Sequence, residues 1–359
     1  MSDLYRNLQI RLDELATGFP ETESGVELKI LKQLFSEKEA GVFLKMAPFI
    51  ETPQVIAERC GEDESVMAEF LEEMAKRGLI FRLKNDKGSR YAASPFVIGI
   101  FEYQVNRMKK ETMENIQKYF YEGFGKTIQG SGTPQLRSVP INKKIVAEWP
   151  IAPYEDVVKI IEDQDRIAIA DCICRTSHKL INDDACDKPI ETCFQFGSHG
   201  DYYVENKMGR YIEKEEALEI IKKNDEAGLV MMPFNAQKVG GMCSCCGDCC
   251  GVLRSLRLQP DPAEAVKSNY YAIIEADECT GCELCLERCQ MEAIEMKDDV
   301  AELIDNRCIG CGLCVTTCPG DSIKLLKKDD ADLYEPPKSG AETYMNIAMA
   351  RNKNPMSHL

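Results

Sequence analysis

The spacing of apolar residues predicts helices and then a hairpin in the first hundred residues. Residues 25–35 place Val, Leu, Ile and Phe at helical intervals. A second helix is expected over 52–60, with Thr52 as its N-cap, and a third over 63–77. Residues 79–93 read as two strands around a turn. The order helix, turn, helix, hairpin favours a winged helix-turn-helix arrangement.

The pattern changes after residue 100. A long helix of mixed charge is predicted over 101–124, and a turn-rich linker begins at Gly130. Helices and strands then alternate, at residues 153–165, 166–174, 214–225 and 229–234. This alternation predicts an α/β unit. The tail after Pro337 reads as a linker and a short helix that docks elsewhere.

A gapless repeat is the clearest pattern in the chain. Residues 279–296 and 308–325 align at a period of 29, and each unit has the spacing Cys-x2-Cys-x2-Cys-x3-Cys. Two copies of one small unit are what a pseudo-twofold ferredoxin fold requires.

The cysteine content indicates that the chain binds metal. The chain has 18 cysteines, and its charged N-terminus has no apolar segment typical of a signal peptide. No run approaches the ~18 apolar residues of a membrane helix. We therefore expect a cytoplasmic protein without membrane insertion, in which reduced, clustered thiols bind metal rather than form disulfides.

The spacing within the repeat is that of [4Fe-4S] ligands, in which the fourth thiolate comes from the other unit. This rule assigns one cluster to Cys279, Cys282, Cys285 and Cys318, and the second to Cys308, Cys311, Cys314 and Cys289. A zinc-ribbon pair would use two Cys-x2-Cys knuckles instead. The repeat resembles bacterial two-cluster ferredoxins, which implies one-electron transfer at low potential. One departure is that Gln290, not proline, follows Cys289.

Nine further cysteines form a second candidate region. They are Cys172, Cys174, Cys186, Cys193, Cys243, Cys245, Cys246, Cys249 and Cys250. Cys172 and Cys174, two apart on a predicted strand, should share a face. Cys246 and Cys249 have chelating spacing, whereas Cys245 and Cys246 should point apart.

The nine thiols suffice for one or two additional [4Fe-4S] clusters, and the partition of ligands stays open. Zinc and reduced thiols are alternatives, and a non-cubane cluster is another, since paired cysteines occur in the heterodisulfide reductase family. Cys249 and Cys250 are expected at a helix N-terminus, which stabilises thiolate.

Single residues near these cysteines have two interpretations each. His178 and His199 are candidate ligands or proton relays, but a hydrogen-bonding role is the simpler interpretation. Arg175 is a candidate for holding a sulfur or an anion, with a salt bridge as the alternative. Cys60 is expected to be a buried apolar residue, as are Met231 and Met232.

Charge argues against nucleic acid as a partner. The net charge is −16, and the helix that would enter the major groove has five acidic residues over 63–77 against two basic ones. We expect the N-terminal unit to mediate interaction, and a redox protein or enzyme complex to be the partner.

The whole layout resembles a group of cysteine-rich 4Fe-4S binding proteins of anaerobic bacteria and archaea. It combines the winged-helix-like start, Cys-x-Cys-Arg at 172–175, the cysteines of 243–250 and the ferredoxin tail. The resemblance covers most of the chain and implies clusters, but no particular reaction.

We therefore expect an α+β multidomain chain. Its units are a winged-helix-like interaction domain (1–98), a helix and linker (99–136), a cysteine-rich α/β domain with an extra metal cluster (137–268), a 2[4Fe-4S] ferredoxin domain (269–328) and a tail (329–359).

Three functions remain open at this point. The first is an electron-transfer component of an anaerobic redox enzyme complex, rather than a stand-alone enzyme. The second is an oxidoreductase with a catalytic cluster at the middle cysteines. The third is a redox-sensing winged-helix regulator. No motif for a nucleotide or a catalytic nucleophile stands out.

Overall fold

A computed structural model describes residues 4–127, 132–141, 145–146, 152–182, 186–304 and 306–357. The N-terminal unit contains α1 (Leu4–Asp13), α2 (Val26–Leu34), α3 (Glu37–Phe43), α4 (Pro53–Cys60), α5 (Glu64–Lys76), β1 (Ile80–Asn85) and β2 (Gly88–Ala93). The predicted helices and the antiparallel hairpin are confirmed. Helix α3 was not predicted. It begins at a capping box in which Ser36 and Glu39 satisfy each other's backbone N–H groups.

Two details at the caps follow from local chemistry. Asp63 accepts hydrogen bonds from the backbone of Ser65 and Val66 and so starts α5. Thr52 occupies the N-cap position of α4, but its side chain makes no capping hydrogen bond. The arrangement of α4, α5 and the hairpin has the predicted order, and its assignment as a winged helix stays a prediction.

The predicted long helix over 101–124 is wrong. The chain instead forms η1 (Phe96–Ile100), η2 (Glu102–Gln104), α6 (Lys110–Tyr119), η3 (Phe120–Phe124) and α7 (Gly125–Thr127). The break is tertiary in origin, because the Gln104 amide donates to the carbonyls of Arg77, Gly78 and Ile100. Lys109 is extended, so α6 starts afresh after it. The first residues of the linker predicted from Gly130 lie outside the described ranges.

The middle unit is built on a five-stranded sheet with the order β6-β4-β5-β8-β7. Its strands are β4 (Ile167–Asp171), β5 (Glu191–Phe196), β6 (Gly209–Ile212), β7 (Val230–Pro233) and β8 (Gly241–Cys245). All four pairings are antiparallel, although helices and strands alternate along the chain. The associated helical segments are η4 (Pro153–Glu155), α8 (Val157–Glu162), α9 (Ile173–Ile181), α10 (Gly197–Glu205), α11 (Lys214–Glu226), α12 (Gly251–Arg257) and α13 (Pro262–Val266).

The C-terminal unit repeats a short helix followed by a strand. Its elements are β9 (Tyr270–Ile274), η5 (Ala276–Glu278), α14 (Leu284–Arg288), β10 (Ile294–Lys297), β11 (Val300–Leu303), α15 (Leu313–Thr317) and β12 (Ile323–Lys327). Strand β12 pairs with β9, and also with β3 (Ile145–Val146) from the segment before the middle sheet. After η6 (Asp330–Asp332), helix α16 (Gly340–Ala350) ends the fold.

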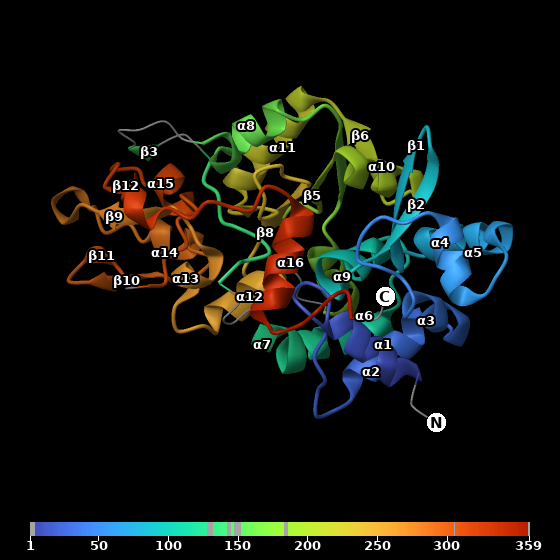
Figure 1. Ribbon diagram of the computed structural model, residues 1–359. Coiled ribbons are helices and arrows are strands. Elements are labelled where there is room, and N and C mark those ends of the chain that lie inside the picture. Colours follow the sequence, from blue (N-terminus) through green and yellow to red (C-terminus); the bar gives the residue numbers. More distant parts are fainter. Residues whose placement is uncertain are drawn as a thin grey trace.

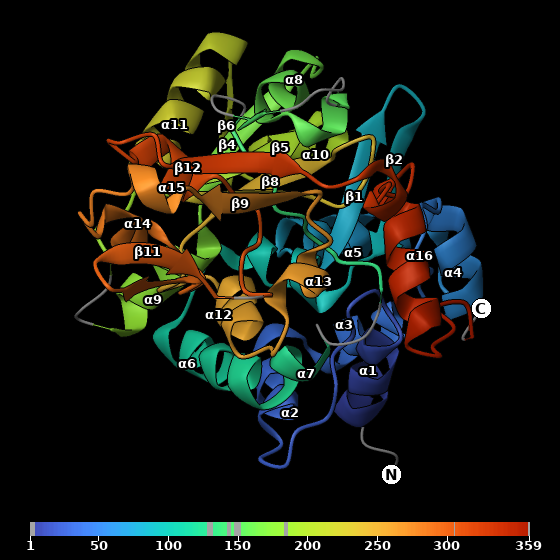
Figure 2. The ribbon, with the colours of Figure 1, turned by 90° about the vertical axis from the view of Figure 1, so that its left-hand side faces the viewer.

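The three units lie side by side, with the middle sheet between the N-terminal helices and the C-terminal unit (Figure 1). Helix α16 runs back from the C-terminal unit to the N-terminal helices, close to α1 (Figure 2). Arg351 anchors this return, since its guanidinium donates to the carboxylate of Asp13 at 2.6 Å and to its carbonyl at 2.8 Å. The expectation that the tail docks elsewhere in the chain is thus confirmed.

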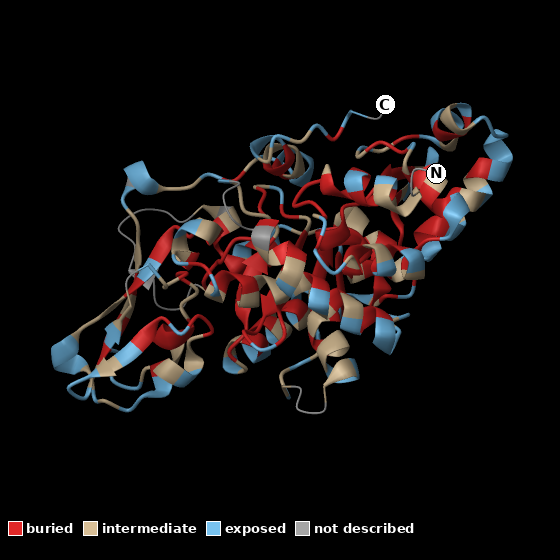
Figure 3. Ribbon diagram, turned by 90° about the horizontal axis from the view of Figure 1, so that it is seen from below, coloured by how far each residue is buried: buried red, intermediate tan, exposed pale blue. Residues whose placement is uncertain are grey.

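Buried residues are concentrated in the centre of the molecule, where the units meet (Figure 3). Helix α6 packs against both α2 and α9, so it joins the N-terminal helices to the middle unit. Within the described ranges, no helix has the length and apolar character needed to cross a bilayer.

Candidate metal centres

The first ferredoxin cavity is lined by four thiols from both repeats. Cys279, Cys282 and Cys285 come from the loop before and the start of α14, and Cys318 follows α15. Ser322 contacts the Cys318 sulfur at 3.2 Å, and hydrogen bonds from Ser322 help to lower the pKa of that thiol. Burial opposes this shift but does not outweigh it.

The second cavity mirrors the first. It is lined by Cys289, Cys308, Cys311 and Cys314. The backbone N–H of Ala293 lies 3.2 Å from the Cys289 sulfur. Gly310, between Cys308 and Cys311, has a φ of 63°, and a side chain there would collide with Tyr270. Each cavity thus brings together the four thiols that the crossed ligand rule groups, which suits a four-thiolate cube.

The nine middle cysteines separate into two groups. The three-thiol group consists of Cys186, Cys246 and Cys249, whose sulfurs all lie within 4.8 Å of one another. Cys186 is 3.3 Å from Cys249 and 4.0 Å from Cys246. Three converging thiols could hold a metal ion, and one position of a tetrahedral site would then have no cysteine ligand among these residues.

The six-thiol group contains the remaining members: Cys172, Cys174, Cys193, Cys243, Cys245 and Cys250. Thiol interactions join Cys172 to Cys174, Cys174 to Cys250, Cys250 to Cys245 and Cys245 to Cys243. Cys193 also interacts electrostatically with Cys243 and Cys172, so it lies near the same thiols. All six are free thiols, so the group has more than the four ligands of one cubane.

The environment of these thiols suits a bound cation. Interactions with Cys243 and Cys250, together with burial, raise the pKa of Cys245 well above its ordinary value. Burial similarly raises the pKa of Cys193. Several buried thiolates repel one another unless positive charge lies between them, and metal coordination supplies that charge.

The predicted strand placement of Cys172 and Cys174 is wrong. Strand β4 ends at Asp171, Cys172 is the N-cap of α9, and Cys174 lies in its first turn. The pairing of β4 with β5 shifts register between Ala170 and Asp171, and Asp171 is the last residue of the strand. The two thiols nevertheless interact, through the turn from strand to helix. Cys250 caps α12, so the helix start predicted near Cys249 and Cys250 is confirmed.

Arg175 contacts sulfur rather than a carboxylate. Its side chain is buried, one guanidinium nitrogen donates to the Ser244 carbonyl at 2.9 Å, and the same nitrogen lies 3.8 Å from the Cys246 sulfur. Among the described residues no carboxylate pairs with it, so the salt-bridge alternative is not supported. The Cys249 thiol and the Arg175 guanidinium lower the pKa of Cys246 to about 5.

The other single-residue predictions have mixed outcomes. Met231 and Met232 are buried in the core, as expected. Cys60 is only partly buried, which corrects that prediction, because it lies in the last turn of α4 at the surface. His199 is stacked on Phe81 with ring centroids 5.0 Å apart, and burial lowers its pKa to about 4.

Two buried polar residues near these groups were not predicted. Glu102 in η2 accepts a hydrogen bond from the backbone of Gly99, and burial raises its pKa to about 8. Gln290, which lines the second ferredoxin cavity, accepts a 2.6 Å hydrogen bond from the backbone N–H of Gly247, which lies between Cys246 and Cys249. The absent proline after Cys289 was the only sequence signal for Gln290, and Glu102 had none.

Comparison with known proteins agrees with the C-terminal geometry. Residues 272–325 match the family model of the 4Fe-4S dicluster domain. Neither the curated proteins nor the solved structures give a match. With eight thiols gathered in two cavities and this match over the same residues, the C-terminal unit of the chain is a ferredoxin-like 4Fe-4S dicluster domain.

Proposed function

We propose that the chain is an iron–sulfur electron-transfer protein that acts as a subunit or partner of a larger redox enzyme. In this proposal the dicluster domain exchanges electrons with a further cluster held by the middle cysteines. Bound [4Fe-4S] clusters supply the one-electron chemistry, and the protein supplies burial, ligands and the connection between sites.

The observation that carries this proposal is the hydrogen bond between Gly247 and Gln290. Gln290 directly follows Cys289, and Gly247 directly follows Cys246. Their 2.6 Å hydrogen bond therefore links a loop of the dicluster domain to the three-thiol group. Electronic coupling falls more slowly through bonds and hydrogen bonds than through space, so this contact supports a path between the two sites.

The contact is held by its surroundings. Arg257 donates from Nε to the Gln290 carbonyl at 2.8 Å and pairs with Glu292 at 3.0 Å. A Cβ on Gly247 would overlap the Arg257 guanidinium and lie 3.0 Å from the Gln290 carbonyl oxygen, so a larger residue would displace Arg257 from this contact. Arg288 adds a second link, since it donates to the carbonyl of Glu226 at 2.7 Å.

The sizes of the two thiol groups suggest different roles. The six-thiol group has enough ligands for a fully thiolate-bound cluster, which suits electron transfer. The three-thiol group leaves one position of a four-ligand site for another molecule. That observation favours a second candidate function, an oxidoreductase whose middle cluster is catalytic.

The regulator hypothesis gains no support from the hairpin. Arg82 of β1 is buried and pairs with Glu72 and with Glu205 of α10, each at 2.5 Å. The hydroxyl of Tyr202, also in α10, donates to the Ile80 carbonyl. The hairpin thus packs against the middle unit, and one of its cations is used internally rather than available to phosphate.

Iron and sulfide counting tests the proposal. Two cubanes hold about eight irons. The chain, purified without oxygen, should hold more than that number, and about twelve irons if one middle cluster is a cubane. The double variant Cys246→Ser/Cys249→Ser should lose the iron bound at the three-thiol group and retain the EPR signals of the dicluster domain. A wild-type content of about eight irons, with no change in the variant, would exclude a middle cluster.

A further inference from the structure

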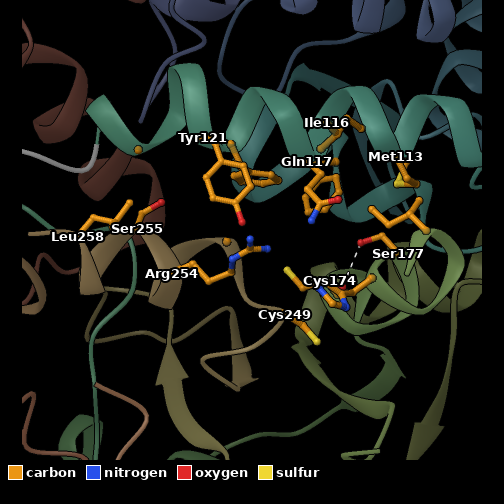
Figure 4. A pocket seen from close by; sticks show the side chains of 16 residues that line it. Met113, Ile116, Gln117, Tyr121, Cys174, Ser177, Cys249, Arg254, Ser255 and Leu258 are labelled. Carbon is orange, nitrogen blue, oxygen red and sulfur yellow. Dashed lines mark hydrogen bonds between the residues drawn. The ribbon is translucent and has the colours of Figure 1, made fainter. Parts of the chain in front are cut away.

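A pocket lies where α6, α9 and α12 meet, beside both groups of middle thiols. Its lining contains Cys174 of the six-thiol group and Cys249 of the three-thiol group. Figure 4 shows both cysteine side chains on one side of the pocket and Tyr121, Gln117 and Ile116 of the α6–η3 segment on the other. A molecule bound here would therefore lie next to both candidate metal sites.

Most of the lining is apolar or aromatic. The residues with this character include Phe101, Met113, Ile116, Phe120, Ile181 and Leu258. Such a surface binds the hydrocarbon part of a small molecule by excluding water. Three aromatic residues, Phe101, Phe120 and Tyr121, favour a flat ring as that part.

One cation faces this apolar surface. The Arg254 guanidinium lies 4.6 Å from the centre of the Tyr121 ring, and Figure 4 shows it directed toward the middle of the pocket. Burial and the neighbouring Arg257 lower the pKa of Arg254. No carboxylate of the described residues forms an ion pair with Arg254, whereas Arg257 is paired with Glu292. A half-buried, unpaired guanidinium recognises a carboxylate well, because it offers two parallel donors.

A second polar group is also unsatisfied. The Nδ1 atom of His178, which belongs to the lining, is buried and has no hydrogen-bond partner among the described residues. Buried polar atoms in native proteins are nearly always paired, so a partner supplied by a bound molecule would explain this one.

We propose that this pocket binds a small aromatic carboxylate. The carboxylate pairs with Arg254, the ring packs on Phe120 and Ile116, and the opposite end lies at Cys174 and Cys249. The chain has a net charge of −16, so attraction of an anion to this pocket depends on local positive charge such as that of Arg254. Binding itself does not depend on the proposed function, whereas an effect on a cluster at these cysteines does.

Binding is tested by calorimetry on the full chain purified without oxygen, with benzoate and phenylacetate as probes and benzamide as the neutral analogue. Both carboxylates should bind, and benzamide at least about ten-fold more weakly. Arg254→Gln should weaken carboxylate binding at least about ten-fold, or about 1.4 kcal/mol, and leave benzamide unchanged. Ile116→Trp should fill the pocket and abolish binding of all three. The matched control is Arg210→Gln, at an exposed arginine of β6, and it should leave the affinities for all three probes unchanged.

Two results would overturn the inference. One is the absence of carboxylate binding to the wild-type chain, and the other is equal affinity in Arg254→Gln and wild type. EPR spectra recorded with bound benzoate give a separate readout. Binding without a spectral change would retain the site and count against a cluster at Cys174 or Cys249, so the two failures are distinguishable.

Discussion

Gly247 and Gln290 join the two cysteine-rich parts of the chain through one 2.6 Å hydrogen bond. Each residue follows a cysteine of its own site, Cys246 for Gly247 and Cys289 for Gln290. Gln290 occupies the position after Cys289 at which two-cluster ferredoxins carry a proline. The departure from the ferredoxin pattern at Gln290 therefore lies at the junction of two candidate redox sites.

Gln290→Pro should remove the hydrogen bond from Gly247 and leave the rest of the loop unchanged. Cys289 has a φ of −75° and a ψ of 105°, a conformation that a following proline accepts. We expect unchanged iron content and slower electron exchange between the dicluster domain and the middle site, measured by rapid-mixing EPR after partial reduction. Gln290→Glu is a useful comparison, because its carboxylate can still accept the Gly247 N–H. Equal exchange rates in wild type and Gln290→Pro would show that electrons do not use this contact.

Serine substitutions should show whether the middle thiols form two sites. Cys246→Ser is expected to alter one spectroscopic signal, and Cys245→Ser a different one, because their sulfurs belong to different groups. EPR and Mössbauer spectra of the two variants are the measurement. Cys60→Ser is the control, since Cys60 lies on α4 outside both groups, and it should leave every signal intact. Loss of the same signal in both Cys246→Ser and Cys245→Ser would indicate a single site.

Glu102 should make stability depend on pH. Its pKa is about 8 in the folded chain because of burial, against about 4.3 when unfolded. Its carboxyl is therefore protonated in both states in acid, and folding loses stability as pH rises from about 4.3 through about 8. Glu102→Gln should remove this loss, which is of the order of 3 kcal/mol at about pH 7.

Thermal unfolding at mildly acidic and mildly alkaline pH measures this effect. The advantage of Glu102→Gln over wild type should grow as pH rises. The control Glu219→Gln, at an exposed position of α11, should follow the wild-type profile. A Glu102→Gln chain with the same pH dependence as wild type would contradict a protonated Glu102.

Arg351 should stabilise the return of the tail to the N-terminal helices. It donates to the Asp13 carboxylate, the Asp13 carbonyl and the Ala16 carbonyl, and its side chain is largely buried. Arg351→Ala should cost about 2–4 kcal/mol, because it leaves the buried Asp13 carboxylate with fewer partners. Limited proteolysis should then cleave before α16 faster than in wild type. An unchanged cleavage rate would mean that other contacts hold the tail.

The sequence alone determined the features that depend on short-range spacing. The repeat at a period of 29 predicted two four-cysteine sets, since a Cys-x2-Cys-x2-Cys loop brings three thiols together by local backbone geometry. The structure gathers the same two sets in two cavities. Helix α5 and the following hairpin were predictable for a related reason, because their caps and turns are made by neighbouring residues.

Only the tertiary structure decided the features that join distant residues. The partition of nine cysteines depends on how β8, α9 and α12 pack, and Cys186 meets Cys249 across 63 positions of chain. The break in the predicted helix over 101–124 comes from hydrogen bonds of Gln104 to residues of the preceding helix and turn. The hydrogen-bond partner of Gln290 is Gly247, which lies 43 positions away in the chain. Local patterns specify which groups are available, but closure of long loops decides which of them meet.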